Sequence, residues 1–399
     1  MKYTTLGSIS KGNRGFYGIG ASAVPYDKEL YTYLRITDIN DDGTLNTTDL
    51  KSVDDENASK YLLEPNDMVF ARTGASTGRN YFYDGSDGKF VYAGFLIKFS
   101  IDPKQINPKF VKYYCLSKPY WDWISAYNTG STRGNINAQT LASMPIPVLP
   151  REYQDQLVSI LDSITEKIRH NKQINNNLEQ QTQLLLSSWL SNNQAEADEV
   201  TLGDVCSKVT DGSHYSPKDD ITSTIPMLSV KDMGTYDFDL GSCKHISEED
   251  YAQMVANDCV PLVNDILVAK DGSYLKEIFI CNERRKLAIL SSIAIFRPNL
   301  EKIYPEILLA FLKTPSVLRE VKENYVSGSA LPRIVLKDFK KLRFKLPHMA
   351  KQHELANILS SIREQIAVNV RQIGNLTALR DTLLPRLMSG ELDVSDVEI

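Results

Sequence analysis

The sequence predicts an α+β protein in which two mixed α/β domains alternate with two long helices, and in which the helices form an antiparallel coiled coil. Two observations predict this fold class: the chain repeats itself with a period of about 198 residues, and each repeat ends in a heptad pattern of apolar residues. The 399 residues also leave room for two to four domains of roughly 100–200 residues each. We expect a first domain at 1–150, a first helix at 151–195, a second domain at 196–347, and a second helix with a tail at 348–399.

The two repeats match first in short segments and then over a long one. Residues 66–74 (NDMVFARTG) recur as residues 264–272 (NDILVAKDG). From Gln154 to Leu185, apolar and polar positions recur in the second copy without loss of register. Solenoid units are only roughly 20–50 residues long, so the chain contains one duplicated domain and one duplicated helix.

Each predicted domain has the composition of a mixed α and β structure. Both are rich in Tyr, Val, Ile, Gly and Pro, with short apolar runs between turn signals such as residues 41–43 (DDG). Short helices are expected at 108–116 and 305–312, because each segment opens with a proline, which suits the first turn of a helix.

The end of each repeat predicts a long helix with one apolar stripe, because apolar residues recur at steps of four and three. If the helices pair in opposite directions about an internal two-fold axis, Asn171 and Asn369 could face each other at the centre, or they could simply fix the register. Pro385 should end or kink the second helix. The predicted seam consists of Leu157, Leu161, Ile164, Ile168, Asn171, Leu178 and Leu185 in the first helix, and Leu355, Leu359, Ile362, Ile366, Asn369, Leu376 and Leu383 in the second.

Common catalytic and metal-binding motifs are missing from the sequence. It contains no G-x-x-x-x-G-K-[ST], H-E-x-x-H or G-x-S-x-G element, and its five cysteines form no C-x-x-C pair. Residues 107–110 (NPKF) come close to the N-P-P-[FY] element of adenine methyltransferases but lack the second proline. We therefore expect no catalytic residue, no metal site and no cofactor in this chain, and interpret it as a binding protein.

Charge and hydropathy limit where the protein acts and what it binds. The net charge of −5 excludes a uniformly basic surface but permits local basic patches. The chain shows neither a secretory signal nor an apolar run of the roughly 20 residues that cross a bilayer. The expected location is the cytoplasm.

Two similar domains suit two similar targets, and duplex DNA offers such targets once per helical turn. The loops at 72–81 and 270–276, and those at 130–135 and 328–333, combine glycine with basic, hydroxyl and aromatic side chains that can reach phosphates and base edges. Ordinary surface turns would have a similar composition. The candidate DNA-binding residues are Arg72, Thr73, Ser76, Arg79, Tyr81, Ser131, Arg133, Asn135, Lys270, Ser273, Tyr274, Lys276, Ser329 and Arg333.

The duplicated layout resembles the specificity subunit of type I restriction-modification systems over essentially the whole chain. The most specific marks are residues 144–150 (MPIPVLP) running into Gln154, and the closing segment 384–394 (LPRLMSGELDV). The glutamate that often precedes this glutamine in the family is replaced by Tyr153 and, in the second copy, by Lys351.

The resemblance implies a non-catalytic subunit of a methyltransferase and endonuclease complex. Each target-recognition domain would read one half of a split, asymmetric DNA site, and the helices would act as a spacer between the halves. The helices and the tail would dock two methyltransferase subunits, which supply the S-adenosylmethionine site, and ATP-dependent restriction subunits can join. Two other functions remain open from the residues: a coiled-coil protein scaffold that never contacts DNA, and an enzyme with its own methyl-transfer or nuclease site.

Overall fold

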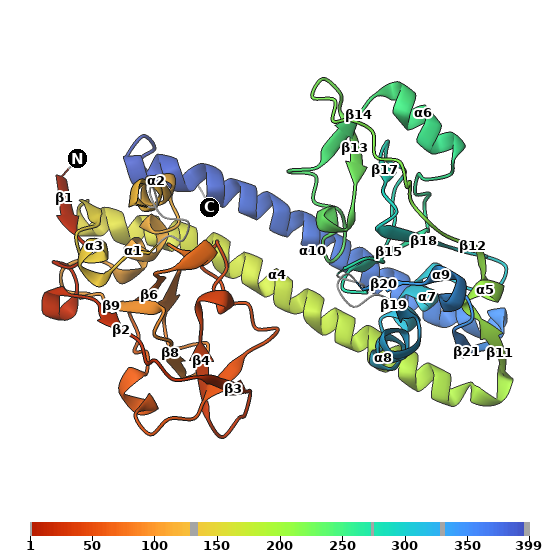
Figure 1. Cartoon of the computed structure of the whole chain (residues 1–399), viewed down its shortest axis with the longest axis horizontal. Coiled ribbons are helices and arrows are strands. Elements are labelled where there is room, and N and C mark those ends of the chain that lie inside the picture. Colours follow the sequence, from red (N-terminus) through yellow and green to blue (C-terminus); the bar gives the residue numbers. More distant parts are fainter. Residues whose placement is uncertain (1, 128–134, 273–274, 328–331, 395–399) are drawn as a thin grey trace. The chain divides into compact units, whose positions relative to one another are not determined.

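Figure 1 shows the computed structural model of the chain, which describes residues 2–127, 135–272, 275–327 and 332–394. Within these ranges no helix is both long enough and apolar enough to cross a membrane. The five cysteines, all in the described part, are buried and free.

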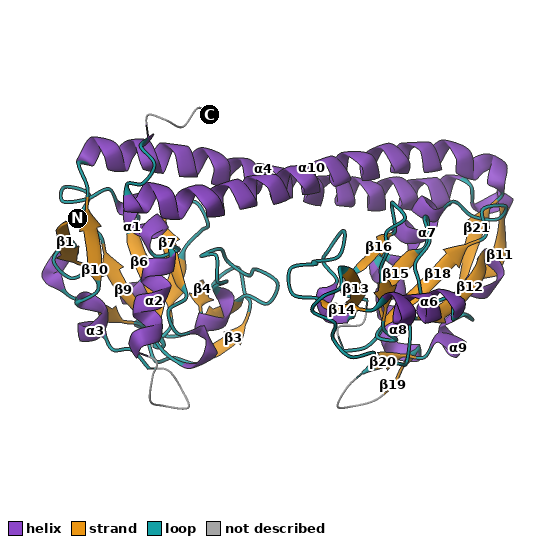
Figure 2. Ribbon diagram, turned by 90° about the horizontal axis from the view of Figure 1, so that it is seen from above, coloured by secondary structure: helices purple, strands orange, loops and turns teal. Residues whose placement is uncertain are grey.

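The chain folds into two units, each of which contains one α/β domain and a part of both long helices. The first unit consists of Met1–Ile168 and Asn375–Ile399, and the second of Arg169–Gly374. Both long helices, α4 (Arg151–Asn192) and α10 (Met349–Ser389), therefore contribute one segment to each unit. In each unit the domain lies on one side of its helix segments (Figure 2).

The first unit is built on two four-stranded sheets. The larger core sheet has the order β2-β9-β6-β7 with antiparallel neighbours, and the second sheet has the order β3-β5-β4-β8 with β4 and β8 parallel. A further antiparallel pair, β1 and β10, joins the two ends of the domain. The strands are β1 (Lys2–Thr5), β2 (Phe16–Tyr17), β3 (Ala23–Pro25), β4 (Tyr31–Leu34), β5 (Lys51–Val53), β6 (Asp67–Ala71), β7 (Asn80–Tyr83), β8 (Phe90–Tyr92), β9 (Leu96–Ser100) and β10 (Pro145–Val148).

The second unit repeats this plan. Its core sheet has the order β12-β18-β15-β16, its smaller sheet the order β14-β13-β17 with β13 and β17 parallel, and β11 pairs with β21 as β1 pairs with β10. A short pair, β19 and β20, lies on the side of this domain away from the long helices (Figure 2). The strands are β11 (Ala197–Thr201), β12 (Cys206–Asp211), β13 (Ile225–Leu228), β14 (Lys244–Ile246), β15 (Ile266–Ala269), β16 (Ile278–Ile280), β17 (Ala288–Ile289), β18 (Ile293–Pro298), β19 (Val326–Ser327), β20 (Arg333–Ile334) and β21 (Arg343–Pro347).

Short helices fill the space around the sheets, and the two that were expected to open with proline do so. The helix predicted at 305–312 spans those residues, and the helix predicted at 108–116 ends two residues earlier, at Tyr114. The α-helices are α1 (Pro108–Tyr114), α2 (Lys118–Tyr127), α3 (Ala138–Ala142), α5 (Leu202–Val205), α6 (Glu248–Ala256), α7 (Pro305–Leu312), α8 (Pro315–Asn324) and α9 (Leu336–Phe339). The 3-10 turns are η1 (Lys11–Asn13), η2 (Ile36–Asp38), η3 (Ala58–Tyr61), η4 (Gly74–Ser76), η5 (Gln194–Glu196) and η6 (Val230–Asp232).

Each core sheet contains an ion pair whose buried acid occupies an equivalent position in the two copies. Asp67 is 1% exposed and lies 3.1 Å from the Nζ of Lys98, and Asp265 is 0% exposed and accepts two hydrogen bonds, of 2.8 and 2.9 Å, from Arg297. The hydrogen bond that Arg297 donates to Asp265 raises the pKa of Arg297. Because an unpaired buried charge is strongly unfavourable, each buried acid has a basic partner on the neighbouring strand, Lys98 on β9 or Arg297 on β18, although the two bases occupy different register positions.

The helix segments run antiparallel in each unit. In the first unit, the Tyr153 hydroxyl near the start of α4 donates to the Leu387 carbonyl near the end of α10, at 3.0 Å. In the second unit, the Trp189 indole near the end of α4 donates to the Lys351 carbonyl near the start of α10, at 3.2 Å. The predicted antiparallel coiled coil is therefore confirmed unit by unit.

The predicted seam faces the interior. Nine of its members are buried, and the other five, Leu178, Leu185, Ile362, Ile366 and Leu376, are partly buried. The expectation that Pro385 would end α10 is wrong, because the helix continues to Ser389 and buries Leu387 completely. Pro385 lies in the last turns, where few backbone hydrogen bonds follow it.

The expected contact between Asn171 and Asn369 is not present. The Asn171 side chain donates to Gln372 at 3.1 Å, and the Asn369 side chain donates to Asn175 at 2.7 Å. The two asparagines therefore lie in two separate polar layers and do not share one. All three asparagines are buried, and their hydrogen bonds fix the register of the helix segments in the second unit.

Candidate nucleic-acid interface

In the first unit, two of the loops predicted from the sequence to bind DNA, those around Arg72 and Asn135, meet at one end of the core sheet. Thr73 and Asn135 form an antiparallel β-bridge, and the Ile136 amide donates to the Arg72 carbonyl at 2.9 Å. These residues are more than sixty positions apart along the chain, so only the tertiary fold brings them together.

The second unit forms the same junction with different side chains. Asp271 and Arg333 form the equivalent antiparallel bridge, and the Ile334 amide donates to the Lys270 carbonyl at 3.0 Å. The amide of Gly272 also donates to the Pro332 carbonyl, at 2.8 Å. We call these two places, Arg72–Thr73 with Asn135 and Lys270–Asp271 with Arg333, the first and second junctions.

A third segment, which contains Gly18 in the first unit and Gly212 in the second, packs closely beside each junction. A Cβ atom at Gly18 would lie 2.2 Å from the Ala93 carbonyl oxygen, and one at Gly212 would lie 2.3 Å from the Ile289 carbonyl oxygen. Only glycine can approach the neighbouring backbone so closely. The residue before each glycine, Tyr17 or Asp211, is thereby held beside the basic residue of its junction.

The first junction places a cation, for which the described residues show no ion pair, beside exposed aromatic rings. The guanidinium carbon of Arg72 lies 5.0 Å from the centre of the Tyr17 ring, and its Nη2 donates to the Asn135 side chain at 3.3 Å. Tyr17 is 43% exposed, and Phe95, whose carbonyl accepts from the Arg72 amide, is 59% exposed. Guanidinium groups stacked on aromatic rings can contact both phosphates and bases.

The second junction neutralises its cation internally. Lys270 is 6% exposed, and its Nζ lies 3.0 Å from Asp271 and 3.4 Å from Asp211. Arg333 in β20 is exposed instead. The same backbone arrangement therefore carries different chemistry in the two units.

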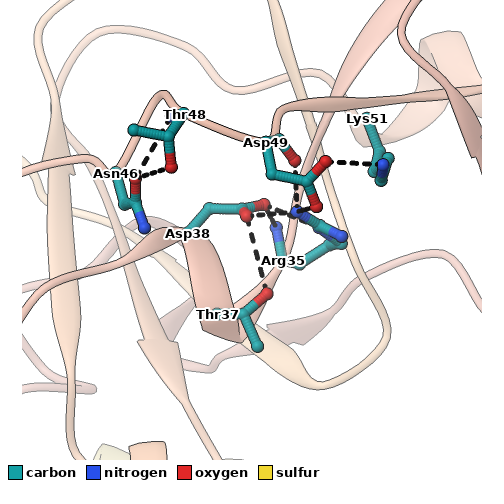
Figure 3. Close-up of polar contacts among 7 residues, drawn as sticks. All are labelled: Arg35, Thr37, Asp38, Asn46, Thr48, Asp49 and Lys51. Atoms are coloured by element: carbon teal, nitrogen blue, oxygen red, sulfur yellow. Dashed lines mark hydrogen bonds and ion pairs between the residues drawn. The ribbon is translucent and has the colours of Figure 1, made fainter. Parts of the chain in front are cut away.

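Another cluster of charges in the first unit is a closed network (Figure 3). The Arg35 side chain lies 2.6 Å from Asp38 and donates to the Asp49 carbonyl at 2.7 Å, while Lys51 lies 2.7 Å from the Asp49 carboxylate. The hydrogen bond to Asp38 raises the pKa of Arg35, and the one from Lys51 lowers the pKa of Asp49. Because Asp38 also accepts from the Arg35 amide at 2.8 Å, we interpret this cluster as a cap for η2.

Comparison with known proteins agrees with the duplication. The family model described as the type I restriction modification DNA specificity domain matches the chain twice, at residues 3–180 and 195–377. The chain belongs to this family. It is a specificity subunit of a type I restriction-modification system, a DNA-recognition component rather than an enzyme, and the alternative of a scaffold that never contacts DNA is not favoured.

Curated relatives and a solved structure resemble the specificity subunit over most of its length. The MjaIX specificity subunit of Methanocaldococcus jannaschii is 25% identical over 325 residues, which are 75% of this chain and 72% of the relative. The HindI specificity subunit of Haemophilus influenzae is 21% identical over 84% of this chain and 88% of its own. The crystal structure of the S subunit from M. genitalium shares the fold, with a TM-score of 0.54 and 18% identity over 97% of this chain and 95% of that one.

Two candidate residues of the specificity subunit, Tyr81 and Ser76, are buried, and a third, Arg79, forms an ion pair. Tyr81 is 4% exposed, and its hydroxyl donates to Asp87 at 2.6 Å in surroundings whose desolvation raises its pKa. Ser76 is buried in η4, and Arg79 is held by Asp41 at 2.7 Å. Tyr81 and Ser76 are therefore corrected to structural residues: Tyr81 lies on β7, where all four side chains are buried.

The other candidates fall into two groups. Lys276 is exposed but lines a groove of about 1140 Å³ between β16, α7 and the helix segments of the second unit. Five further candidates lie outside the described residues, namely Ser131, Arg133, Ser273, Tyr274 and Ser329.

Tyr17 and Asp211 were not predicted from the sequence. The repeat keeps little residue identity over β2 and β12, so a search for matching segments passes over them. Their shared signal is the glycine that follows each, Gly18 or Gly212, but a lone glycine becomes informative only when its close backbone approach is known.

Proposed function

We propose that this specificity subunit reads a split, asymmetric DNA sequence, one half with each domain, and that the paired long helices set the gap between the halves. One observation carries the proposal: the two junctions have the same backbone bridges and glycine approach but different side chains. Tyr17, Arg72 and Asn135 in the first correspond to Asp211, Lys270 and Arg333 in the second. Equivalent scaffolds with different polar groups would recognise different base sequences.

The proposal includes the partners. Two methyltransferase subunits would dock on the long helices and the closing tail, and would supply the S-adenosylmethionine site; ATP-dependent restriction subunits would bind ATP. Support comes from exposed apolar side chains on both long helices, which a docked subunit would cover. They include Ile174 and Leu184 on α4, and Ile358 and Leu379 on α10.

In this arrangement the partner performs the chemistry. An adenine inside a duplex is out of reach of any enzyme until it is flipped out of the stack. The specificity subunit would hold the duplex at the two half-sites, with salt-dependent phosphate contacts for affinity and base-edge contacts for discrimination.

A binding experiment tests the proposal. The methylated sequence is first identified by sequencing methylated adenines in cells that carry the system. A duplex with that sequence, and one with both halves scrambled, are then titrated with the subunit with and without its methyltransferase at fixed salt. We expect the assembled complex to prefer the intact site by at least about 10³-fold. Equal affinity for the two duplexes would refute the proposal.

A further inference from the structure

We infer that the equivalent cations Arg72 and Lys270 play different parts in reading DNA. Arg72 reads a base edge in the first half-site, with Tyr17 as the residue that positions it. Lys270 contacts no DNA and positions the loop, which leaves contact with the second half-site to Arg333. The inference rests on the proposed function and assigns roles within it.

The contacts of Arg72 restrain its guanidinium group and leave its charge available. The guanidinium carbon lies over the Tyr17 ring, 5.0 Å from its centre, and Nη2 donates to the Asn135 side chain at 3.3 Å. Its Nε is buried without a hydrogen-bond partner. Within the described ranges its recorded partners are thus one ring and one amide, and no ion pair joins them.

A fixed plane distinguishes base reading from phosphate binding. A phosphate needs only positive charge nearby, which a mobile side chain supplies equally well. Two parallel hydrogen bonds to the O6 and N7 atoms of guanine need the guanidinium in one orientation before DNA arrives. The support from Tyr17 and Asn135 supplies that orientation, so the geometry favours a guanine edge as the target of Arg72.

Tyr17 is itself held in place. Its hydroxyl accepts a hydrogen bond from the Ala138 amide at 3.1 Å, at the start of α3. The strand around it cannot shift, because Gly18 lies against the Ala93 carbonyl without room for a Cβ atom. The ring that supports Arg72 is therefore part of the rigid scaffold rather than of a loop.

Lys270 has the opposite surroundings. Its ammonium group lies between the carboxylates of Asp211 and Asp271 and is almost fully removed from solvent. Its charge is neutralised twice, and a buried ammonium group has no access to a phosphate or base. Its backbone carbonyl accepts from the Ile334 amide, so the ion pairs of Lys270 fix the strand that carries Arg333.

Matched conservative substitutions test the two roles in the assembled methyltransferase. Arg72→Lys keeps the charge but loses the planar fork, and Lys270→Arg keeps the charge at the other junction. Each complex is titrated against the cognate duplex and a set of duplexes with single substituted base pairs, at several salt concentrations. Assembly and thermal unfolding are measured alongside.

For Arg72→Lys we expect discrimination at one G·C pair of the first half-site to fall by about five- to 150-fold, with an unchanged salt dependence. For Lys270→Arg we expect every preference to stay within about threefold. A uniform loss on all duplexes for Arg72→Lys, or no change at all, would overturn the base-reading role. The inference would also be overturned if Lys270→Arg lowered discrimination at a base pair of the second half-site by a similar factor.

Two further variants keep the test decisive if Arg72→Lys does not assemble. Tyr17→Ala should lower discrimination at the same base pair. Tyr17→Phe, which keeps the ring, should retain it. If both retain wild-type discrimination, Tyr17 does not position Arg72. Failure of the unmodified complex to prefer its site would instead count against the proposed function.

Discussion

The side chains that the two copies share are those that hold each domain together, and those that differ lie where the loops meet. Asp67 and Asp265 are both buried acids with a basic partner on the neighbouring strand. By contrast, Tyr17 and Asp211 occupy equivalent positions with unlike chemistry. A duplicated recognition protein needs this combination, because the scaffold must persist while the contacts diverge.

The buried acid of the second core sheet should be important for stability. We expect Asp265→Asn to lower the free energy of unfolding by about 2–3 kcal/mol, since it removes a charged hydrogen-bond partner from Arg297, which keeps some access to water. Urea unfolding of the full chain measures the change. Asp49→Asn, at an exposed ion pair, is the control and should leave the free energy of unfolding nearly unchanged. Equal effects of the two substitutions would contradict the assignment.

Between elements, a pair of equivalent glutamines fastens each domain to its long helix. Gln154 donates to the Leu149 carbonyl and accepts from the Asn107 amide, both at 2.8 Å, and thereby joins the end of β10, the start of α1 and the first turn of α4. Gln352 donates to the carbonyls of Pro347 and Lys302 at 3.0 Å in the second copy. This explains why the glutamine follows the proline-rich strand in both repeats.

Removal of this fastening should loosen the domain from its helix. We expect Gln154→Ala to destabilise the chain by about 1–3 kcal/mol, because it leaves the partly buried Asn107 amide and Leu149 carbonyl without this partner. Glu152→Ala, on the exposed face of the same turn, should change stability by less than about 0.5 kcal/mol. Thermal unfolding compares the two variants, and hydrogen exchange at the Asn107 amide reports the local effect. An unchanged exchange rate at that amide would show that the glutamine does not fasten the domain.

Periodic features were predictable from the sequence, and contacts between distant segments were predictable only in part. The heptad stripes and the proline at the start of α7 are local patterns, and the structure agrees with them. Both loops of the first junction were selected from the sequence because each recurs in the repeat, but their contact with each other was not predicted. The partner of Arg72, by contrast, depends on how β2 meets β9, and no local pattern encodes that. Tyr81 was misassigned because a tyrosine in a loop and one in a buried strand look alike in sequence.

For the chain as a whole, the proposed function implies that the length of the long helices sets the gap between the two DNA half-sites. One heptad inserted after Ile168 in α4 and one after Gly374 in α10, at the boundary between the units, would keep the seam in register and leave both junctions unchanged. Each insertion adds seven residues at 1.5 Å each, or about 10 Å, which corresponds to roughly three base pairs. We therefore expect the same two half-sequences with a longer gap, measured by sequencing methylated adenines in cells that carry the variant. A heptad in α4 only breaks the pairing and should abolish methylation. If the doubly extended variant methylates sites with the original gap, the helices do not set the distance.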